Sequence, residues 1–422
     1  KKNASSFGLL TVLLLLFSFA FVGFKLVKVK MLPFDNKEEF QVLIDYPPMT
    51  ALNQSLLKSD LLVKELLKNE NIIKVQVFVG DPAPYSFSGM VKHTFLRNLE
   101  SMNDLQIVLK NKSDRNVSSH EIIESLRPTI SKFGKVHGAV TKVLEIPPGP
   151  PVMATMVAEI YGPNVLERTK VAKEIYNVFA AEPSIVDLDS SLRNGRPKLV
   201  YPIDYDKAGT FGIRSLALAS TGYFLFSESP LVSLSTASEP EEVTLNLSVE
   251  DKLRSSQTPF QYQNLMSLES GVIQASTVIG KPRVEEDRAL YRKNLKPVTY
   301  VMSELSGAEE APVYGMLKLA PKINYETQTA DVPWNTTKPI VKWDGEWFIT
   351  YEVFRDLGSA FAVVMLLIYV LVLGWFRSYT VPLIIMAPIP ISLIGILPGH
   401  WIMGAYFTAT SMIGFIAGAG II

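Results

Sequence analysis

The chain has 422 residues, a formal net charge of zero and no cysteine. The lack of cysteine excludes disulfides, thiolate metal sites and cysteine nucleophiles, and the balanced charge lacks the basic excess of a nucleic-acid-binding protein. Apolar residues make up 48% and charged residues 19% of the sequence, so the chain is more apolar than an ordinary soluble protein.

Residues 7–24 (FGLLTVLLLLFSFAFVGF) are the first long apolar segment. The 18 uncharged residues are long enough for a transmembrane helix. A secretory signal peptide is the alternative, because Lys1 and Lys2 precede the segment. The apolar core is too long for a signal peptide and no A-x-A site follows it, so we predict a first membrane span with its flanks over residues 1–30.

Residues 31–150 alternate between strand and helix patterns. Strand patterns occur at residues 39–45, 72–79, 105–110 and 139–146. Apolar residues at helical spacing follow the first of them, at 52–67, and a capping box, Ser118-x-x-Glu121, opens a second helix. The order β-α-β-β-α-β predicts a ferredoxin-like subdomain.

The same pattern begins again at residues 155–160 and predicts an internal repeat. Asn164 can cap the next helix, and strands are predicted at 185–188 and 296–305, with a short closing helix at 311–323. Residues 204–290, rich in Ser and Thr with β-like pieces at 241–249 and 271–279, interrupt this unit. We therefore predict a discontinuous second subdomain, residues 151–203 and 291–345, and a separate inserted subdomain at 204–290.

Residues 346–422 contain three further uncharged runs, about 357–376, 380–398 and 402–422. Buried helices of a soluble core are the alternative, but three such runs in close succession favour membrane spans. The short loop with Arg377 indicates the cytoplasmic side, which places the large block between the first and second spans outside the cytoplasm. The chain ends within the last apolar run, so we expect that helix to be truncated.

No pattern for catalysis or metal binding stands out. Four histidines are scattered without a carboxylate or second histidine at ligand spacing, and each is interpreted as a surface or satisfied side chain: His93, His120, His137 and His400. No P-loop motif is present, which argues against ATP-driven pumping by this chain. An Asp-Gly turn explains Asp344 beside Glu346, and core packing is preferred to soft-metal binding for Met153 and Met156.

The predicted spans hold no Asp, Glu, Lys or Arg at membrane depth, so the chain carries no ionisable relay of the kind coupled transport usually needs. Gly414 and Gly418 form a G-x-x-x-G pair with Gly420 beside it. This pattern favours close packing of the last helix against another helix in the bilayer.

Three stretches resemble the resistance–nodulation–division (RND) efflux transporters of the acriflavine-resistance type. VKMLPFDNKEEFQVLIDYPP resembles the start of their second periplasmic loop. DGEWFITYEVFRDLGSAFAVVMLLIYVLVLGWF resembles the return of that loop to the membrane, and PLIIMAPIPISLIGILPGHWIMGAYFTATSMIGFIAGAGII resembles the next two helices. The resemblance covers essentially the whole chain.

The resemblance implies an α+β polytopic membrane protein: part of the second half of a permease, from its seventh helix into its tenth. The α/β units would be periplasmic porter subdomains and the insertion a docking subdomain. Such permeases act as homotrimers in the inner membrane of Gram-negative-type bacteria, with a periplasmic adaptor and an outer-membrane channel. They export amphipathic compounds by proton antiport and are not enzymes, so no cofactor beyond the proton motive force is expected.

The loop GDPAPYSFSG, residues 80–89, falls where the family has a substrate-path loop. Tyr85 and Phe87, with Phe78 before them, are therefore the substrate-path candidates, although ordinary packing is the preferred interpretation of these side chains. A membrane-anchored binding or assembly protein without transport, and a lipid- or protein-export relative of the same layout, stay open as other functions.

Overall fold

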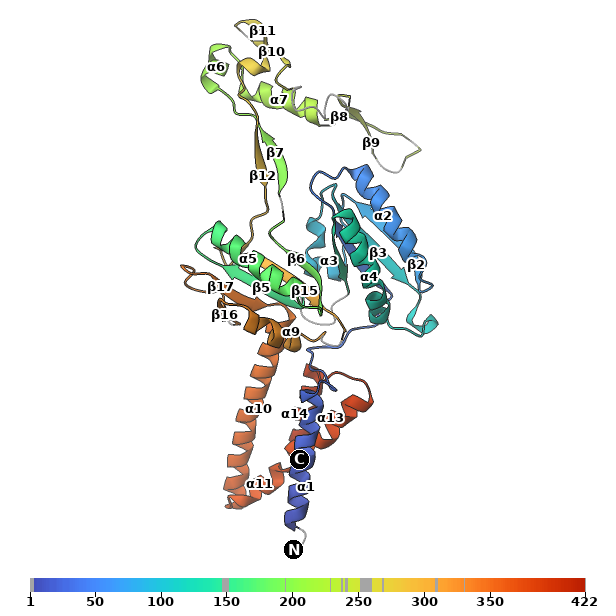
Figure 1. Ribbon diagram of the computed structural model, residues 1–422, viewed down its shortest axis with the longest axis vertical. Helices are drawn as coiled ribbons and strands as arrows, with labels where there is room; N and C mark the ends of the chain where they lie inside the picture. The colour runs from blue at the N-terminus through green and yellow to red at the C-terminus, as the bar shows by residue number, and fades with distance from the viewer. Residues whose placement is uncertain are drawn as a thin grey trace. The chain divides into compact units, whose positions relative to one another are not determined.

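Figure 1 shows the computed structural model of the chain. The residues that it describes are 4–145, 152–193, 195–227, 229–236, 238–239, 242–250, 260–267, 269–307, 310–329 and 331–421. They form two compact units, one made of Lys1–Asn194 with Ala289–Ile422 and the other of Gly195–Arg288. The first unit contains two α/β lobes and a group of apolar helices.

The first lobe is a four-stranded antiparallel sheet with helices. Its elements are β1 (Glu39–Asp45), α2 (Leu52–Leu66), β2 (Ile72–Val79), α3 (Phe87–Lys92), the 3₁₀ turn η1 (Thr94–Leu96), β3 (Met102–Leu109), η2 (Lys112–Asp114), α4 (Ser119–His137) and β4 (Val140–Leu144). The strand order β2-β3-β1-β4 is that of two interleaved βαβ units. The predicted order of elements is confirmed, with strand ends shifted by up to three residues; residue 146, the predicted end of the fourth strand, lies outside the described residues.

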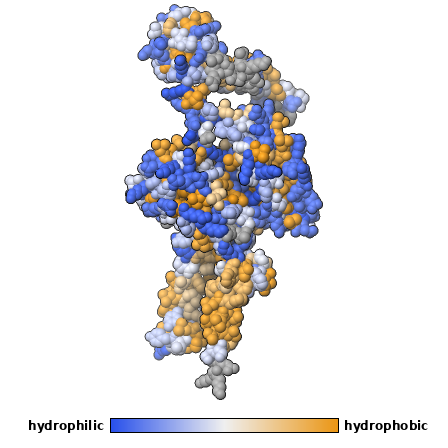
Figure 2. Space-filling view, in the orientation of Figure 1, coloured by the Kyte–Doolittle hydropathy of each residue, from blue (hydrophilic) through white to orange (hydrophobic). Residues whose placement is uncertain are grey.

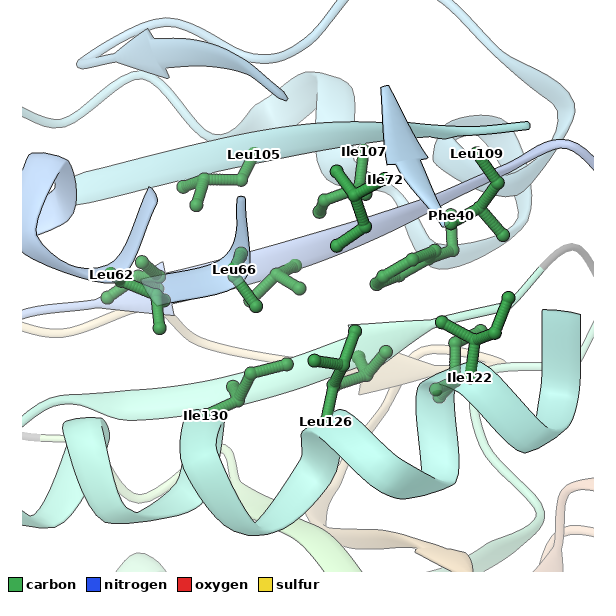
Figure 3. Close-up of a cluster of buried hydrophobic side chains, with 14 of the residues drawn as sticks. Phe40, Leu62, Leu66, Ile72, Leu105, Ile107, Leu109, Ile122, Leu126 and Ile130 are labelled. Carbon is green, nitrogen blue, oxygen red and sulfur yellow. The ribbon is translucent and has the colours of Figure 1, made fainter. Parts of the chain in front are cut away.

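The core of the first lobe lies between one face of its sheet and helices α2 and α4 (Figure 3). Phe40, Val42 and Ile44 alternate along β1, so all three point to this face and are almost fully buried. Burying each such side chain stabilises the lobe by about 1.5–3 kcal/mol. The capping box that begins α4 is confirmed: Ser118 Oγ accepts from the Glu121 N–H at 3.2 Å, and Glu121 Oε2 accepts from the Ser118 N–H at 2.7 Å.

The second lobe repeats this topology around an insertion. Its elements are β5 (Met156–Tyr161), α5 (Val165–Ala180), β6 (Ile185–Ser190), the short pair β13 (Arg292–Lys293) and β14 (Lys296–Pro297), β15 (Thr299–Leu305), α9 (Pro312–Leu319), η5 (Ala320–Lys322), β16 (Glu326–Gln328) and β17 (Ile340–Asp344). Within the sheet order β16-β17-β5-β15-β6, the last four strands match β4-β1-β3-β2 of the first lobe. The internal repeat is therefore present, and Asn164 caps α5 as predicted, accepting from the Glu167 N–H at 2.9 Å.

The second unit, Gly195–Arg288, has its own small apolar core. Its elements are β7 (Arg196–Val200), α6 (Tyr205–Thr210), α7 (Ser215–Phe226), β8 (Ser229–Leu234), β9 (Val243–Leu247), β10 (Asn264–Ser267), β11 (Gly271–Gln274), η3 (Ala275–Thr277) and β12 (Arg283–Asp287). The sequence pattern missed α7, whose residues are apolar on all sides rather than on one stripe.

The apolar helices are α1 (Ala4–Gly23), α10 (Glu346–Phe376), α11 (Thr380–Met386), α12 (Pro388–Ile391), α13 (Leu393–Ile402) and α14 (Ala409–Ile421). Within the described residues, three helical stretches are long and apolar enough to cross a membrane: Ser5–Gly23, Glu346–Phe376 and Thr380–Ile402. Their exposed surface is predominantly hydrophobic (Figure 2), as expected where lipid replaces water. α10 begins eleven residues before the predicted start because the charged segment at its beginning is also helical.

The prediction of a fourth span over residues 402–422 is wrong in its first part. Helix α13 ends at Ile402, and Gly404 adopts a positive φ of 61°. Phe407 then forms a β-bridge with Val29, the segment that follows α1. The described part of the last helix begins only at Ala409, where Thr408 Oγ1 accepts from the Ser411 N–H at 3.3 Å.

Gly345 forms the sharp turn from β17 into α10, with φ of +83°. A Cβ here would collide with the carbonyl oxygen of Ala154 and lie 3.1 Å from that of Thr155. We expect Gly345→Ala to lower the free energy of unfolding by at least about 2 kcal/mol, because strain and collision add. Gly271→Ala is the control, since its φ is +74° but its Cβ would meet open space. Equal shifts in the thermal unfolding midpoint of both variants would contradict the collision.

Candidate functional site

The predicted substrate-path residues lie on the segment that joins β2 to β3, residues 80–101, here named the aromatic loop. Tyr85 is 74% exposed and Phe87 50% exposed, and the ring of Tyr85 lies 6.5 Å from that of Phe95. Phe78 lies in β2 and is half-buried. Tyr85 and Phe87 therefore belong to an exposed apolar surface rather than to the core, contrary to the packing alternative.

A buried arginine anchors the aromatic loop to the sheet. Arg97, 8% exposed, donates from Nε to Asp104 Oδ1 at 2.6 Å and from Nη1 to Asp45 Oδ1. Its Nη2 donates to the carbonyl oxygens of Ile44 and Asn103, both at 3.2 Å. Every edge of the guanidinium is thus bonded, and both carboxylates lie at the face of the sheet opposite the core. The loop that carries Tyr85 and Phe87 is held by charge at its base while its tip is exposed.

Asp45 also connects the two lobes. Its second oxygen accepts from Nη1 of Arg193, which follows β6 in the second lobe. Arg193 pairs in turn with Asp189 at 2.5 Å, and Lys142 of β4 reaches the same carboxylate at 2.6 Å. Burial raises the pKa of Asp189, but Lys142 and Arg193 outweigh burial and hold it well below its usual range. A continuous chain of alternating charges therefore runs from one lobe into the other.

Further ion pairs, Arg127 with Asp187 and Lys92 with Glu304, cross between the lobes. Arg127 of α4 donates to Asp187 of β6 and, at 2.7 Å, to Glu124 of its own helix. Lys92, the last residue of α3, pairs with Glu304 of β15 at 2.8 Å. The eight residues of these four ion pairs are here named the lobe seam: Asp45, Lys92, Arg127, Lys142, Asp187, Asp189, Arg193 and Glu304. Interfaces of this polar kind permit relative motion of domains more readily than apolar ones.

A third set of contacts ties both lobes to the ends of apolar helices through Glu310, which lies just before α9. Glu310 accepts from Lys28 Nζ at 3.1 Å, in the segment after α1, and from the hydroxyl of Tyr406, between α13 and α14. His120 of α4 lies between Glu310 and Glu145, with Nε2 at 3.1 Å from the first and Nδ1 at 2.9 Å from the second. These five residues are here named the Glu310 junction.

The pKa values of the junction show how strongly its charges depend on one another. Burial alone lowers the pKa of His120, but hydrogen bonds to Glu145 and Glu310 outweigh burial and raise it to about 9. Burial raises the pKa of Glu310, but its bonds to His120, Tyr406 and Lys28 lower it to about 2. His120 is thus held as a cation between two carboxylates.

His120, Glu124 and Glu145 place one ligand atom each within 4.8 Å of one another, as a metal site requires. Other groups already occupy these atoms. Arg127 donates to Glu124 and lies 3.9 Å from Glu145, and Ser306 donates to Glu124. Since a bound cation would have to displace the Arg127 guanidinium and deprotonate His120, this group fits an ion-pair network better than a metal site.

The predicted close packing of Gly414, Gly418 and Gly420 does not form within the described part of the chain. A Cβ added at any of the three would meet open space. Helix α14 instead contacts α10 through Phe415 and Phe361, whose rings lie 5.5 Å apart. Packing of the three glycines against a helix from elsewhere stays a prediction.

Local sequence patterns do not indicate the charged residues of the site, because the partners of these residues lie far away along the chain. Arg97 and Asp45 are 52 residues apart, and His120 and Glu310 are 190 apart. His400 is satisfied, as expected, by the carbonyl of Ile396 and the hydroxyl of Ser411. One sequence feature does indicate these ion pairs. Asp45 and Asp104 are acids within apolar strands, and a buried acid needs a cationic partner.

Comparison with known proteins decides the family. The family model described as the AcrB/AcrD/AcrF family matches residues 3–422. The chain belongs to this family. It is therefore related to the RND efflux transporters, as the three quoted stretches indicate, and the family consists of membrane transporters rather than enzymes.

Solved structures agree with this placement at the level of the fold. Crystal forms I and II of a heavy metal efflux pump align with TM-scores of 0.78 and 0.77, each at 16% sequence identity. The alignments cover 99% and 100% of this chain but only 41% of each pump. The chain thus spans less than half the length of these pumps. No curated protein matches it.

Proposed function

We propose that the chain forms part of an inner-membrane permease that exports amphipathic small molecules, driven by proton influx. In this proposal the two lobes are porter subdomains in the periplasm, and the aromatic loop contacts the substrate. Exposed Tyr85 and Phe87 on an anchored loop are the observation that carries it, because aromatic side chains give large apolar contact area at low entropic cost.

The lobe seam supports a transport cycle in which the lobes separate and rejoin. Its contacts are ion pairs, and such pairs can exchange partners with water when the interface opens. The Glu310 junction would link that movement to α1 and to the α13–α14 connection. The chain thus supplies a path for coupling, while the acidic residues of a proton relay would come from helices outside it.

The remaining parts of the proposal concern assembly. We expect a homotrimer in which this chain is part of the second half of each permease. The unit Gly195–Arg288 would be the docking subdomain that faces a periplasmic adaptor protein and an outer-membrane channel. The membrane lipid surrounds α1 and α10–α14.

Metal-ion export is the second candidate, because the two similar structures are of a heavy metal efflux pump. The one observation in its favour here is the group His120, Glu124 and Glu145. The ion pairs described above already engage these side chains, so amphipathic substrates are preferred.

Export by the permease that carries this chain tests the proposal. We expect the double variant Tyr85→Ala/Phe87→Ala to lower the efflux of an amphipathic dye about tenfold, since roughly 1.4 kcal/mol of lost contact is a factor of ten. Dye efflux in energised cells and growth at raised Zn²⁺ concentration are measured side by side. Trp334→Ala is the control, because Trp334 is an aromatic residue of the second lobe that is 95% exposed.

Normal dye efflux in the double variant would show that the aromatic loop does not contact the substrate. No dye efflux by the wild-type permease, together with protein that is folded and inserted, would favour an anchored binding protein. Zn²⁺ resistance that disappears in His120→Gln would favour the metal candidate.

A further inference from the structure

The N-terminus of α5, in the second lobe, presents backbone donors without acceptors. β5 ends at Tyr161, and a short turn leads to Asn164, the N-cap of α5. The first N–H groups of a helix have no partner inside it, and the helix dipole adds positive potential there. The Asn164 side chain accepts from the Glu167 N–H. Among the described residues, no acceptor is bonded to the N–H of Val165 or of Leu166.

A buried arginine reaches back to this N-terminus from the first turn of α5. Arg168 is 8% exposed, and its Nη1 donates to the carbonyl of Gly162 at 3.1 Å. Arg97 and Arg115 are equally buried, but Arg97 is bonded to two carboxylates and Arg115 to three carbonyl oxygens. The Nε of Arg168 is buried without a partner among the described residues. A buried charge with unfilled donors is unfavourable, so the Arg168 guanidinium has bonding capacity left for a ligand.

The register of the sheet brings two further cations to the same place. Tyr161, at the end of β5, is paired with Ile340 of β17, so Lys338 lies at this end of the sheet. On the other side of β5, Pro297 precedes β15 and is paired with Arg292 of β13. α10 follows the opposite end of β17, away from these residues. The three side chains around the start of α5 are here named the α5 cations: Arg168, Arg292 and Lys338.

Among the described residues, no acid balances the α5 cations, and none of the three forms an ion pair. Glu167, the acid of the first turn, is exposed and accepts from the side chain of Asn164 at 3.4 Å. Glu159 of β5 is paired with Lys293 at 2.5 Å. Glu326, on the strand beyond β17, is exposed and joined to none of the three. The start of α5 therefore carries an excess of positive charge.

Electrostatics within the group agree with this excess. Burial lowers the pKa of Arg168, and the like charge of Arg292 lowers it further, whereas no carboxylate of the described residues raises it. We propose that the N-terminus of α5 binds a phosphate group, held by the α5 cations and by the N–H groups of Val165 and Leu166. A phosphate carries up to two charges and several acceptor oxygens, which suits two guanidinium groups and a helix N-terminus better than a carboxylate does.

Binding of inorganic phosphate to the full-length permease, in micelles of dodecyl maltoside, tests the proposal. Arg168→Gln and Arg292→Gln should each weaken phosphate binding on the order of tenfold, because each removes a charge-assisted hydrogen bond. Lys173→Gln is the matched control: it removes the same charge from an exposed position farther along α5 and should bind phosphate like the wild type. No phosphate binding by the wild type, or unchanged binding in both arginine variants, would overturn the proposal.

Thermal unfolding separates phosphate binding from a structural role of the arginines. Phosphate should raise the unfolding temperature of the wild type and of Lys173→Gln more than that of the two arginine variants, because a ligand stabilises the folded state that binds it. Without phosphate, Arg292→Gln should unfold at the wild-type temperature, since Arg292 is exposed. Phosphate also stabilises proteins in general, so an equal rise in all four proteins would overturn the proposal.

The source of the phosphate group is determined by a comparison of two kinds of nanodisc. Phosphate binding that is weaker in phosphatidylglycerol than in phosphatidylcholine identifies a lipid phosphate as the occupant. Displacement of phosphate by glycerol 3-phosphate, equal in both kinds of nanodisc, identifies a soluble phosphate ester. The inference goes beyond the proposed function and does not rest on it, because none of these measurements involves export. Failure of wild-type dye efflux rejects the proposed function alone, and unchanged phosphate binding in the arginine variants rejects this inference alone.

Discussion

Arg97→Met is expected to lower the free energy of unfolding of the first lobe by about 3–5 kcal/mol, because it leaves buried carboxylates without their cation. Asp104 is 1% exposed and Asp45 6% exposed. Asp45 keeps Arg193 as a partner, whereas among the described residues Asp104 keeps only the N–H of Ala83, at 3.2 Å. The aromatic loop should lose its anchor at the same time. Thermal unfolding and limited proteolysis between residues 80 and 101 measure the two effects.

Arg115→Met is the matched control for this prediction. Arg115 is also 8% exposed and lies in the same lobe, but it donates to the backbone carbonyls of Lys110, Val117 and Lys37 rather than to carboxylates. Loss of the Arg115 guanidinium should lower the free energy of unfolding by a smaller amount, about 1–3 kcal/mol. Adding Asp104→Asn to Arg97→Met should recover part of the stability, because it removes one unpaired charge. A smaller effect for Arg97→Met than for Arg115→Met would contradict the role of the buried carboxylates.

Glu310→Gln is expected to uncouple the lobes from the apolar helices and to remove a pH dependence of stability. The pKa of His120 rises from 6.5 to about 9 in the folded protein, so its stabilising contribution is complete below pH 6.5 and is lost as the pH rises through 9. This shift in the pKa of His120 corresponds to about 3 kcal/mol of folding stability. Glu310 behaves in the opposite sense: with a pKa lowered from 4.5 to about 2, its contribution is complete above pH 4.5 and is lost as the pH falls through 2.

The junction should therefore be most stable between pH 4.5 and 6.5, and the wild-type unfolding temperature should fall between pH 6.5 and 9. Glu310→Gln should lower the unfolding temperature at pH 6 and flatten this fall, and His120→Gln should abolish it. His137→Gln, at the other end of α4, should keep the wild-type profile. The coupling role is wrong if the Glu310→Gln permease exports dye at the wild-type rate while its pH profile is flat.

Local sequence patterns predicted most elements correctly because the forces behind them act over short distances. The alternation in EFQVLID marks a strand at Glu39–Asp45, and Ser118 with Glu121 marks the start of α4. The repeat of strand, turn and helix also indicated that the second lobe copies the first, which its strand order confirms. Where local signals conflict with tertiary contacts they fail: residues 403–408 are apolar enough to continue a helix, but Phe407 pairs with Val29 instead.

The sequence by itself determined that the chain combines repeated α/β units with membrane-length apolar helices, since periodicity and the length of uncharged runs are local properties. Only the tertiary structure decided which charges matter. Lys28, Lys30 and Lys92 look alike in the sequence, yet Lys28 joins the Glu310 junction, Lys30 is buried over the ring of Phe34, and Lys92 crosses the lobe seam. The energy of a charge depends on its burial and on the partners beside it, and folding brings those partners from distant parts of the chain.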